Sequence, residues 1–419
     1  MEAPGLDPSM RLFPFTVLAS QVSCESHILW AFGALNCAGT GGYNGSITLL
    51  EALMNRRPSQ TPRRSDINTG RFRTTSPEAF LDRVPGDARR GAPLARGFLF
   101  LLLALVLFNL LVNRMVVVRE VEVRVFGLDP ALDGYTILQL SDLKGARFGP
   151  GQSRLAHALQ GKDYDVVVCT GDMVSPLGNA QPFYELLERL DEASSADIYY
   201  IPGDTDPVPV SMDHASSGSP YAPWVLGATQ RGARLLSSPV RLAEGNPSIW
   251  LTAASELTLD LAAQQTRFAE MKSQAEAQGD AAESDLAAYQ LARITGMQQA
   301  RKEMAPSDLC IALTHVPPAD EYVARLRSPS GAPLTLLLAG HWLGGLSRLP
   351  LLGPLFVPDG RLDRYGLFPG DYGRLRLVGT TKVYDSPGLG RREERYPPFF
   401  FRTFNPPSVT LLRLRVSSF

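Results

Sequence analysis

The sequence predicts a layered α/β domain preceded by one apolar membrane helix, and two patterns carry this prediction. From Tyr135 onward, short apolar runs are each followed by an aspartate or a histidine, and helix-like stretches separate the first of these runs. Such alternation is typical of a sheet whose strands are covered by helices. Ahead of this region lies a continuous apolar stretch, Phe98 to Val112, in which Asn109 is the only polar residue.

Composition limits the class of protein. The 419 residues are 44% apolar, 20% charged and 9% aromatic, which excludes a mainly disordered chain and a polytopic membrane protein. The 41 basic residues balance the 42 acidic ones, so net charge does not indicate nucleic acid or another polyanion as a partner. The four cysteines are too few for a disulfide scaffold and form no CxxC metal pair.

The first 95 residues show no sustained hydrophobic period, and we assign no fold to residues 1–95. From Asn55 to Arg96 ten arginines and no lysine alternate with prolines, which indicates a flexible basic tract. A start site placed unusually far upstream is an alternative explanation of this region.

The apolar stretch predicts a membrane anchor over residues 97–118. A helix needs about 20 residues to cross the hydrocarbon layer, and Phe98 to Val118 reaches this length by including Asn113 and Arg114. A buried core helix or a signal-peptide core is the alternative, but no small-residue cleavage site follows Val112. The arginines before the stretch predict a cytoplasmic N-terminus. We therefore expect a single-pass protein of the cell membrane, with the bilayer as a partner and the C-terminal domain outside the cytoplasm.

Six apolar runs after the anchor predict strands, and five of them end beside a polar residue. Those five are Tyr135–Leu140 before Asp142, Asp165–Thr170 before Asp172, Asp197–Pro202 before Asp204, Asp308–Thr314 before His315, and Leu334–Ala339 before His341. The sixth, Ser408–Val416, predicts the last strand. Helix-like stretches are Ser153–Leu159 and Pro182–Ala193. The Ala- and Glu-rich segment 258–304 predicts a helical insertion, either one long helix or a hairpin broken near Gly279.

The polar residues at the strand ends predict a shared site. In open α/β sheets, ligands bind where the carboxyl ends of the strands converge. A single aspartate at a strand end is usually a helix cap or turn residue, but five such positions in one domain favour a common function. Their carboxylates and imidazoles suit a divalent cation such as Mn, Fe or Zn. The candidate metal ligands are Asp142, Asp172, Asp204, His315 and His341.

This ordered series resembles the calcineurin-like metallophosphoesterase superfamily, and most closely its membrane-anchored branch, over residues 134–416. The matching segments are Ser141–Lys144, Leu313–Pro317, Gly340–Gly345, Tyr365–Phe368, Ser386–Gly390 and Phe404–Ser408. The resemblance implies a four-layer α/β/β/α sandwich with two metal ions bridged by Asp172. It also implies hydrolysis of a phosphate ester or pyrophosphate by metal-activated water, with Asp172 and His341 as catalytic residues.

The sequence departs from the family pattern in ways that imply an eroded site. Lys144 and Leu343 stand at two histidine positions of the first metal, and neither an ammonium nor an alkyl side chain coordinates a cation. Thr205 replaces the histidine that assists the leaving group, and His214 is an alternative acid. The ligands of the second metal are retained, although Asp204 replaces an asparagine.

We therefore expect one divalent ion rather than two, or none, and a domain that acts as a binding or scaffold protein for a phosphate-containing ligand. A slow phosphoesterase working with one metal is the alternative. The Lys144 ammonium is expected to lie between Asp142 and Asp172, because clustered carboxylates repel one another unless a cation is present. The alternative is that Lys144 points to solvent. Nucleic acid is not an expected partner, since no aromatic stacking platform accompanies the arginines.

Overall fold

The structure is a computed structural model that describes residues 88–216, 218–345, 347–349, 352–355, 374–390 and 402–417. The described residues all belong to one compact unit that extends from Val84 to Phe419. Most of the arginine-rich tract and the segment Tyr365–Phe368 lie outside the described residues. Side chains are described from Arg96 onward.

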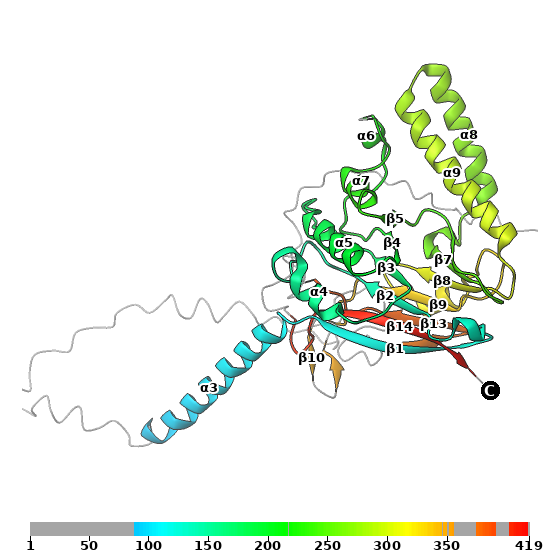
Figure 1. Cartoon of the computed structure of the whole chain (residues 1–419). Helices are drawn as coiled ribbons and strands as arrows, with labels where there is room; N and C mark the ends of the chain where they lie inside the picture. The colour runs from blue at the N-terminus through cyan, green and yellow to red at the C-terminus, as the bar shows by residue number, and fades with distance from the viewer. Residues whose placement is uncertain are drawn as a thin grey trace, which may run out of the picture. The chain divides into compact units, whose positions relative to one another are not determined.

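Two six-stranded sheets form the centre of this unit (Figure 1). The first has the order β1-β14-β2-β3-β4-β5 and the second β12-β13-β9-β8-β7-β6. Strands β2 to β5 are parallel to one another, as are β7 to β9. The strands of the first sheet are β1 (Val117–Phe126), β2 (Thr136–Leu140), β3 (Val166–Thr170), β4 (Asp197–Ile201), β5 (Ala233–Leu235) and β14 (Ser408–Ser417). Those of the second are β6 (Val240–Ala243), β7 (Ile249–Ala253), β8 (Leu309–Leu313), β9 (Leu336–Ala339), β12 (Leu375–Val378) and β13 (Thr381–Asp385).

The two sheets pack face to face, and helices cover their outer faces. Strand β2 illustrates why. Its five residues are all buried, because Leu138 and Leu140 pack against helices while Ile137 faces the other sheet. The helices on the first sheet are α4 (Ser153–Leu159), α5 (Gln181–Ala193) and α7 (Pro223–Thr229). The second sheet contacts α10 (Asp320–Val323) and the end of α9. The predicted α/β sandwich is confirmed.

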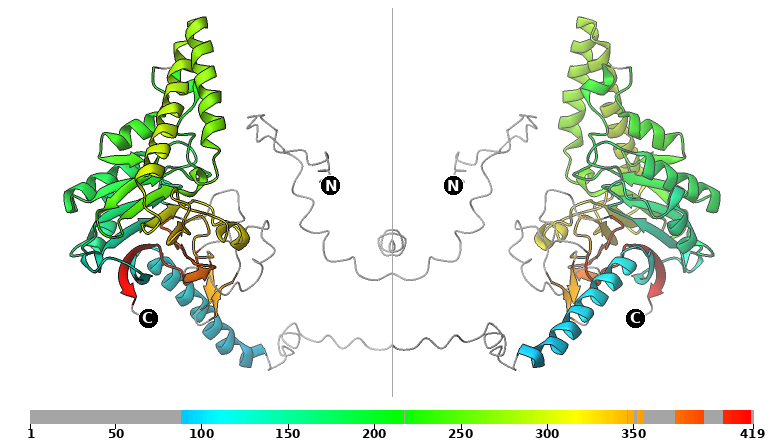
Figure 2. Two further views of the ribbon diagram at one scale, coloured as in Figure 1. Left: turned by 90° about the vertical axis from the view of Figure 1, so that its right-hand side faces the viewer. Right: turned by 90° about the vertical axis from the view of Figure 1, so that its left-hand side faces the viewer.

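The predicted helical insertion is a hairpin of α8 (Leu261–Gln278) and α9 (Ala281–Glu303), which Figure 2 shows extending away from the sheets. Gly279 ends α8 in the left-handed region, with φ of 72°, a conformation that favours glycine. The side chain of Asp280 then caps α9 by accepting a hydrogen bond from the Glu283 backbone. The break is therefore explained by two adjacent residues, Gly279, which ends α8, and Asp280, which caps α9.

The prediction of a membrane anchor over residues 97–118 has to be corrected. The apolar stretch forms α3 (Ala88–Val112), but the chain enters β1 at Val117, so the last residues of the predicted anchor belong to the sheet. Among the described residues, no helix has both the length and the apolar character needed to cross a membrane. The end of α3 is part of the folded domain, because Asn109 and Asn113 donate side-chain hydrogen bonds of 2.9 and 2.7 Å to the Arg402 carbonyl.

The remaining short elements lie in the segments between the main strands and helices. They are η1 (Pro130–Leu132), η2 (Pro150–Gln152), α6 (Met212–Ala215), η3 (Ala254–Glu256), β10 (Arg348–Leu349) and β11 (Gly353–Pro354). Of these, η3 matters for the site, because it follows β7 directly and lies opposite α9.

Candidate metal centre

Both sheets contribute to a cluster of four potential metal ligands. Asp172 and Asp204 follow β3 and β4 of the first sheet, and His315 and His341 follow β8 and β9 of the second. One ligand atom of each lies within 4.8 Å of the others. The structure therefore brings together four of the five predicted ligands, two from each sheet.

The glycines that precede these ligands allow the close approach. A side chain at Gly203 would overlap Asp172 Oδ1, and one at Gly340 would overlap Ser141 Oγ. The ligands themselves turn sharply at the strand ends, since φ is 55° at Asp172 and 70° at His341. Non-glycine residues adopt such values uncommonly, and functional sites are one place where they occur. The Gly-Asp and Gly-His pairs are thus a geometric requirement of the cluster.

His315 presents one defined nitrogen to the cluster. Its Nδ1 lies 2.8 Å from the Thr170 carbonyl oxygen, and only a protonated Nδ1 can donate to that acceptor. The other nitrogen, Nε2, lies 3.2 Å from Asp172 Oδ2 and 2.9 Å from Asp204 Oδ1. In the neutral ring this Nε2 carries a lone pair directed at the two carboxylates, which is the orientation of a metal ligand.

The fourth ligand, His341, completes a donor set that fits a divalent cation. Its Nδ1 lies 3.4 Å from Asp204 Oδ1 and 3.3 Å from His315 Nε2. Two imidazoles and two carboxylates match the preference of Mn, Fe or Zn. The residues present therefore fit such an ion.

The electrostatics of the cluster favour a positive charge among the carboxylates. Burial opposes ionisation of Asp172, but hydrogen bonding to His315 and the Lys144 charge outweigh it, so the pKa of Asp172 is below its usual value. Hydrogen bonds to His315 and His341 likewise lower the pKa of Asp204. Burial opposes protonation of His315, yet the hydrogen bonds to Asp172 and Asp204 raise its pKa well above the usual value.

Lys144 supplies one such charge from within the chain. Its Nζ lies 2.8 Å from Asp172 Oδ2 and 3.8 Å from Asp142 Oδ1, and its side chain is only 8% exposed. The structure thus places the ammonium between the two carboxylates, as predicted, and the alternative of a solvent-facing lysine is wrong.

Asp142, the fifth predicted ligand, does not belong to the four-residue cluster. Its carboxylate lies beside Lys144, and its Oδ2 accepts hydrogen bonds from Ser141 Oγ and from the His341 backbone. The aspartate is completely buried. In this arrangement Asp142 orients His341 and balances the Lys144 charge.

The residues that depart from the family pattern make other contacts. Leu343 is buried and contributes only its carbonyl oxygen, which accepts a hydrogen bond from Asn405. Thr205 contacts the cluster through its backbone, whose N–H donates a 2.9 Å hydrogen bond to Asp172 Oδ1. His214 lies on α6 with its Nε2 3.2 Å from the Val208 carbonyl oxygen. It is not among the four clustered ligands.

Sequence reasoning missed Arg402, which holds the backbone next to the candidate metal centre. Its buried guanidinium donates hydrogen bonds to four carbonyl oxygens, those of Pro387, Gly388, Gly390 and Asn405. The segment held in this way is hydrogen-bonded to the backbone of Ser141 and Asp142. A lone arginine before the Phe404–Ser408 segment gives little sign of this role, because its acceptors are distributed over two loops.

Comparisons with known proteins show only remote likeness. No protein-family model matches the sequence, and no curated protein matches it. Among solved structures, phosphopantetheinyl hydrolase from Mycobacterium tuberculosis is 10% identical, with 64% of this chain and 99% of that chain covered and a TM-score of 0.31. The sulfate thiohydrolase SoxB of Thermus thermophilus, solved in complex with glycerol, is 12% identical with a TM-score of 0.30. That comparison covers 63% of this chain and 53% of SoxB.

Proposed function

We propose that the domain is a metallophosphoesterase-type protein that binds one divalent cation and a phosphate-containing ligand with little or no turnover. Asp172, Asp204, His315 and His341 would hold the ion. The observation that carries the proposal is the position of Lys144, whose ammonium lies 2.8 Å from Asp172 Oδ2.

The Lys144 charge argues for one ion rather than two. A second cation beside Asp142 and Asp172 would stand within a few Å of the ammonium. At about 4 Å and an effective dielectric near 20, each pair of unit charges repels by about 4 kcal/mol, and a divalent ion doubles this. Leu343 offers no ligand atom in compensation.

The chain's own residues favour binding over hydrolysis. A divalent ion held by the cluster would attract phosphoryl oxygens and acidify a nearby water. Thr205, however, offers only a hydroxyl where a leaving group needs a proton donor of suitable pKa. Apart from the candidate ligand Asp204, the acid nearest to Thr205 in sequence is Asp206, but both of its oxygens accept backbone hydrogen bonds, from Val174 and Gly203. Its carboxyl is therefore used to hold the loops.

A slow phosphoesterase with one metal is the second candidate. It is favoured by a specific observation, a pocket of about 490 Å³ that opens beside His315. One ion can still supply charge to a phosphoryl group, but it lacks the second ion that would stabilise both the attacking and the leaving oxygen.

Metal stoichiometry and turnover test the proposal directly. We expect elemental analysis after dialysis against Mn²⁺ to give one ion per chain, and assays with aryl phosphate mono- and diesters to show little or no turnover. His315→Ala should weaken Mn²⁺ binding by more than about 100-fold, because it removes a buried ligand. His214→Ala is the matched control and should bind Mn²⁺ normally.

Each alternative result has a clear meaning. Two ions per chain, or none, would overturn the proposal. Measurable turnover that is lost in His315→Ala would favour the slow phosphoesterase instead.

Three earlier expectations stay predictions: contact of the chain with a lipid bilayer, the extracytoplasmic position of the domain, and the lack of a nucleic-acid partner. The first has one supporting observation. Large apolar side chains of α3 are exposed, including Phe98 at 69% and Phe100 at 75%.

A further inference from the structure

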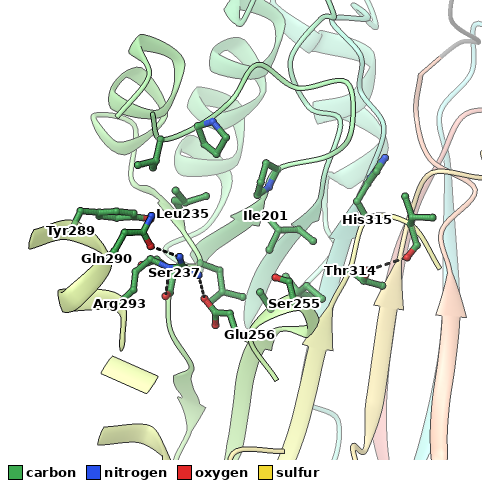
Figure 3. A pocket seen from close by; sticks show the side chains of 17 residues that line it. Ile201, Leu235, Ser237, Ser255, Glu256, Tyr289, Gln290, Arg293, Thr314 and His315 are labelled. Atoms are coloured by element: carbon green, nitrogen blue, oxygen red, sulfur yellow. Dashed lines mark hydrogen bonds and ion pairs between the residues drawn. The ribbon is translucent and has the colours of Figure 1, made fainter. Parts of the chain in front are cut away.

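A pocket adjoins the metal cluster on the side of the helical insertion (Figure 3). It has a volume of about 490 Å³, which lies in the range of small-molecule sites. His315 forms one end, and Pro202, at the end of β4, leads into the loop that carries Asp204. The pocket therefore adjoins the candidate metal centre through His315.

Most of the pocket wall is apolar. Ile201, Leu235, Leu236 and Val210 contribute to it, and Figure 3 shows Ile201 between His315 and Leu235. This surface would favour a hydrocarbon or ring that leaves water on binding.

The end opposite His315 is polar and is formed by α9. Tyr289, Gln290 and Arg293 lie there, across the pocket from His315 (Figure 3). Arg293 is held in place, because it donates to the Gln290 side chain at 2.6 Å and to the Ser237 carbonyl at 3.3 Å. It also lies 3.4 Å from the Glu256 carboxylate in η3.

The pocket is built by contacts between separate elements. Tyr289 of α9 packs edge-on against Tyr221, with ring centroids 5.2 Å apart. Tyr221 in turn forms a β-bridge with Val210, a residue of the pocket wall. The inserted hairpin thus fixes the position of the loop after β4, and the opening beside the cluster depends on the insertion.

We propose that this pocket is the second half of the ligand site, and that the ligand is an amphiphilic phosphoric ester. Its phosphate group binds at the metal cluster, and its apolar alkyl or aryl group fills the pocket toward Arg293. This inference rests on the proposed function and adds the class of ligand to it. The cluster alone would accept any phosphate, whereas the pocket selects esters with an apolar group of suitable length.

A pair of phosphate probes tests the inference. Calorimetry in the presence of Mn²⁺ compares the affinities of inorganic phosphate and n-hexyl phosphate for the full chain. Burial of one methylene contributes about 0.8 kcal/mol, and a tenfold change in affinity corresponds to about 1.4 kcal/mol. Burial of only two methylenes would therefore suffice, and we expect hexyl phosphate to bind at least about tenfold more tightly than inorganic phosphate. Hexanol without phosphate should bind far more weakly than hexyl phosphate.

Two pocket variants and one control locate the effect. Ser255 lines the pocket and is exposed, so Ser255→Phe should fill the space without disturbing the core. Val210→Trp fills the pocket from another lining residue. In both variants hexyl phosphate should bind no more tightly than inorganic phosphate, so that the ratio of their affinities falls to about one. Ser273→Phe, an equal change at an exposed position of α8, should keep the tenfold ratio.

The outcomes separate this inference from the proposed function. If Mn²⁺ and inorganic phosphate bind but the hexyl group adds nothing, the pocket assignment is overturned while the proposed function stands. A tenfold ratio that persists in both filled variants would also overturn it. If the chain binds no Mn²⁺, the proposed function fails, and the ligand assignment fails with it.

Discussion

The ammonium of Lys144 brings one positive charge to two carboxylates that are completely buried, those of Asp142 and Asp172. Desolvation of buried charges is costly, and the pair remains favourable only while both partners are present. Removal of the lysine would leave two buried negative charges without the ammonium that lies beside both of them. Lys144 is therefore expected to stabilise the fold and to limit the number of metal ions.

We predict that Lys144→Ala lowers the free energy of unfolding by about 3–5 kcal/mol in metal-free buffer. Added Mn²⁺ should recover part of this loss and raise the stoichiometry above one, because the carboxylates then need another cation. Chemical denaturation with and without Mn²⁺ measures both effects. Lys162→Ala, which removes an exposed ion pair with Glu120, is the control and should have little effect. A melting temperature unchanged in both buffers would contradict the prediction.

At this scale the sequence predicted which residues gather at the strand ends, but not the individual hydrogen bonds that they make. The order of aspartates and histidines at strand ends predicted which side chains meet, because parallel strands bring their carboxyl ends to one edge. It did not separate Asp142 from the other four ligands. That distinction depends on hydrogen bonds from Ser141 and the His341 backbone, and such bonds depend on local turn geometry.

At the scale of elements, α9 contacts the segment after β7 through an ion pair between Arg293 and the buried Glu256. Glu256 in η3 is 6% exposed, and burial raises its pKa to about 7, although Arg293 acts in the opposite direction. In the unfolded chain Glu256 has a pKa of 4.5 and loses its proton near that pH. In the folded state the same carboxyl keeps its proton up to about pH 7.

The sign of the pH dependence follows from this difference. Between pH 4.5 and about 7 the folded state holds more protons at Glu256, so the contribution of this residue to stability falls as the pH rises. A shift from 4.5 to about 7 corresponds to about 3 kcal/mol. We predict that Glu256→Gln gains stability relative to the parent chain by up to this amount between pH 4.5 and 7.5. Urea denaturation of both proteins across that range measures the difference, and parallel curves would contradict the assignment.

The elements themselves were largely predictable, with one instructive exception. Strands such as β3 and β8 and the break at Gly279 carry strong local signals, namely short β-rich apolar runs and a residue suited to the left-handed region. The anchor prediction had to be corrected. Hydrophobicity alone did not reveal that the chain enters β1 at Val117, or that Asn109 donates a hydrogen bond to the Arg402 carbonyl, 293 residues away. The pocket was not predicted either, since its walls come from elements that are distant in sequence.

At the scale of the whole molecule, the candidate metal site connects the two sheets. Asp172 and Asp204 belong to the first sheet, and His315 and His341 to the second. An ion bound by all four would stabilise the packing of the sheets, because the unfolded chain does not preform the site.

We predict that Mn²⁺ at 100 times its dissociation constant stabilises the folded state by about 2.7 kcal/mol. Thermal denaturation followed by circular dichroism should show a higher melting temperature, which EDTA reverses. The His315→Ala chain should show no such rise at the same Mn²⁺ concentration. Bound Mn²⁺ without any thermal shift would mean that the unfolded chain binds the ion as tightly as the folded one, which would contradict the prediction.

The pairing of β1 with β14 has a practical consequence for any attempt to isolate the domain. The two strands are parallel and in register over ten residue pairs, from Val117–Ser408 to Phe126–Ser417. A truncation that removes α3 but starts before Val117 keeps this ladder intact. A chain that begins after Phe126 would lack β1 and leave one edge of β14 unpaired. Unpaired strand edges recruit other chains. The choice of first residue therefore decides between a monodisperse preparation and an aggregating one.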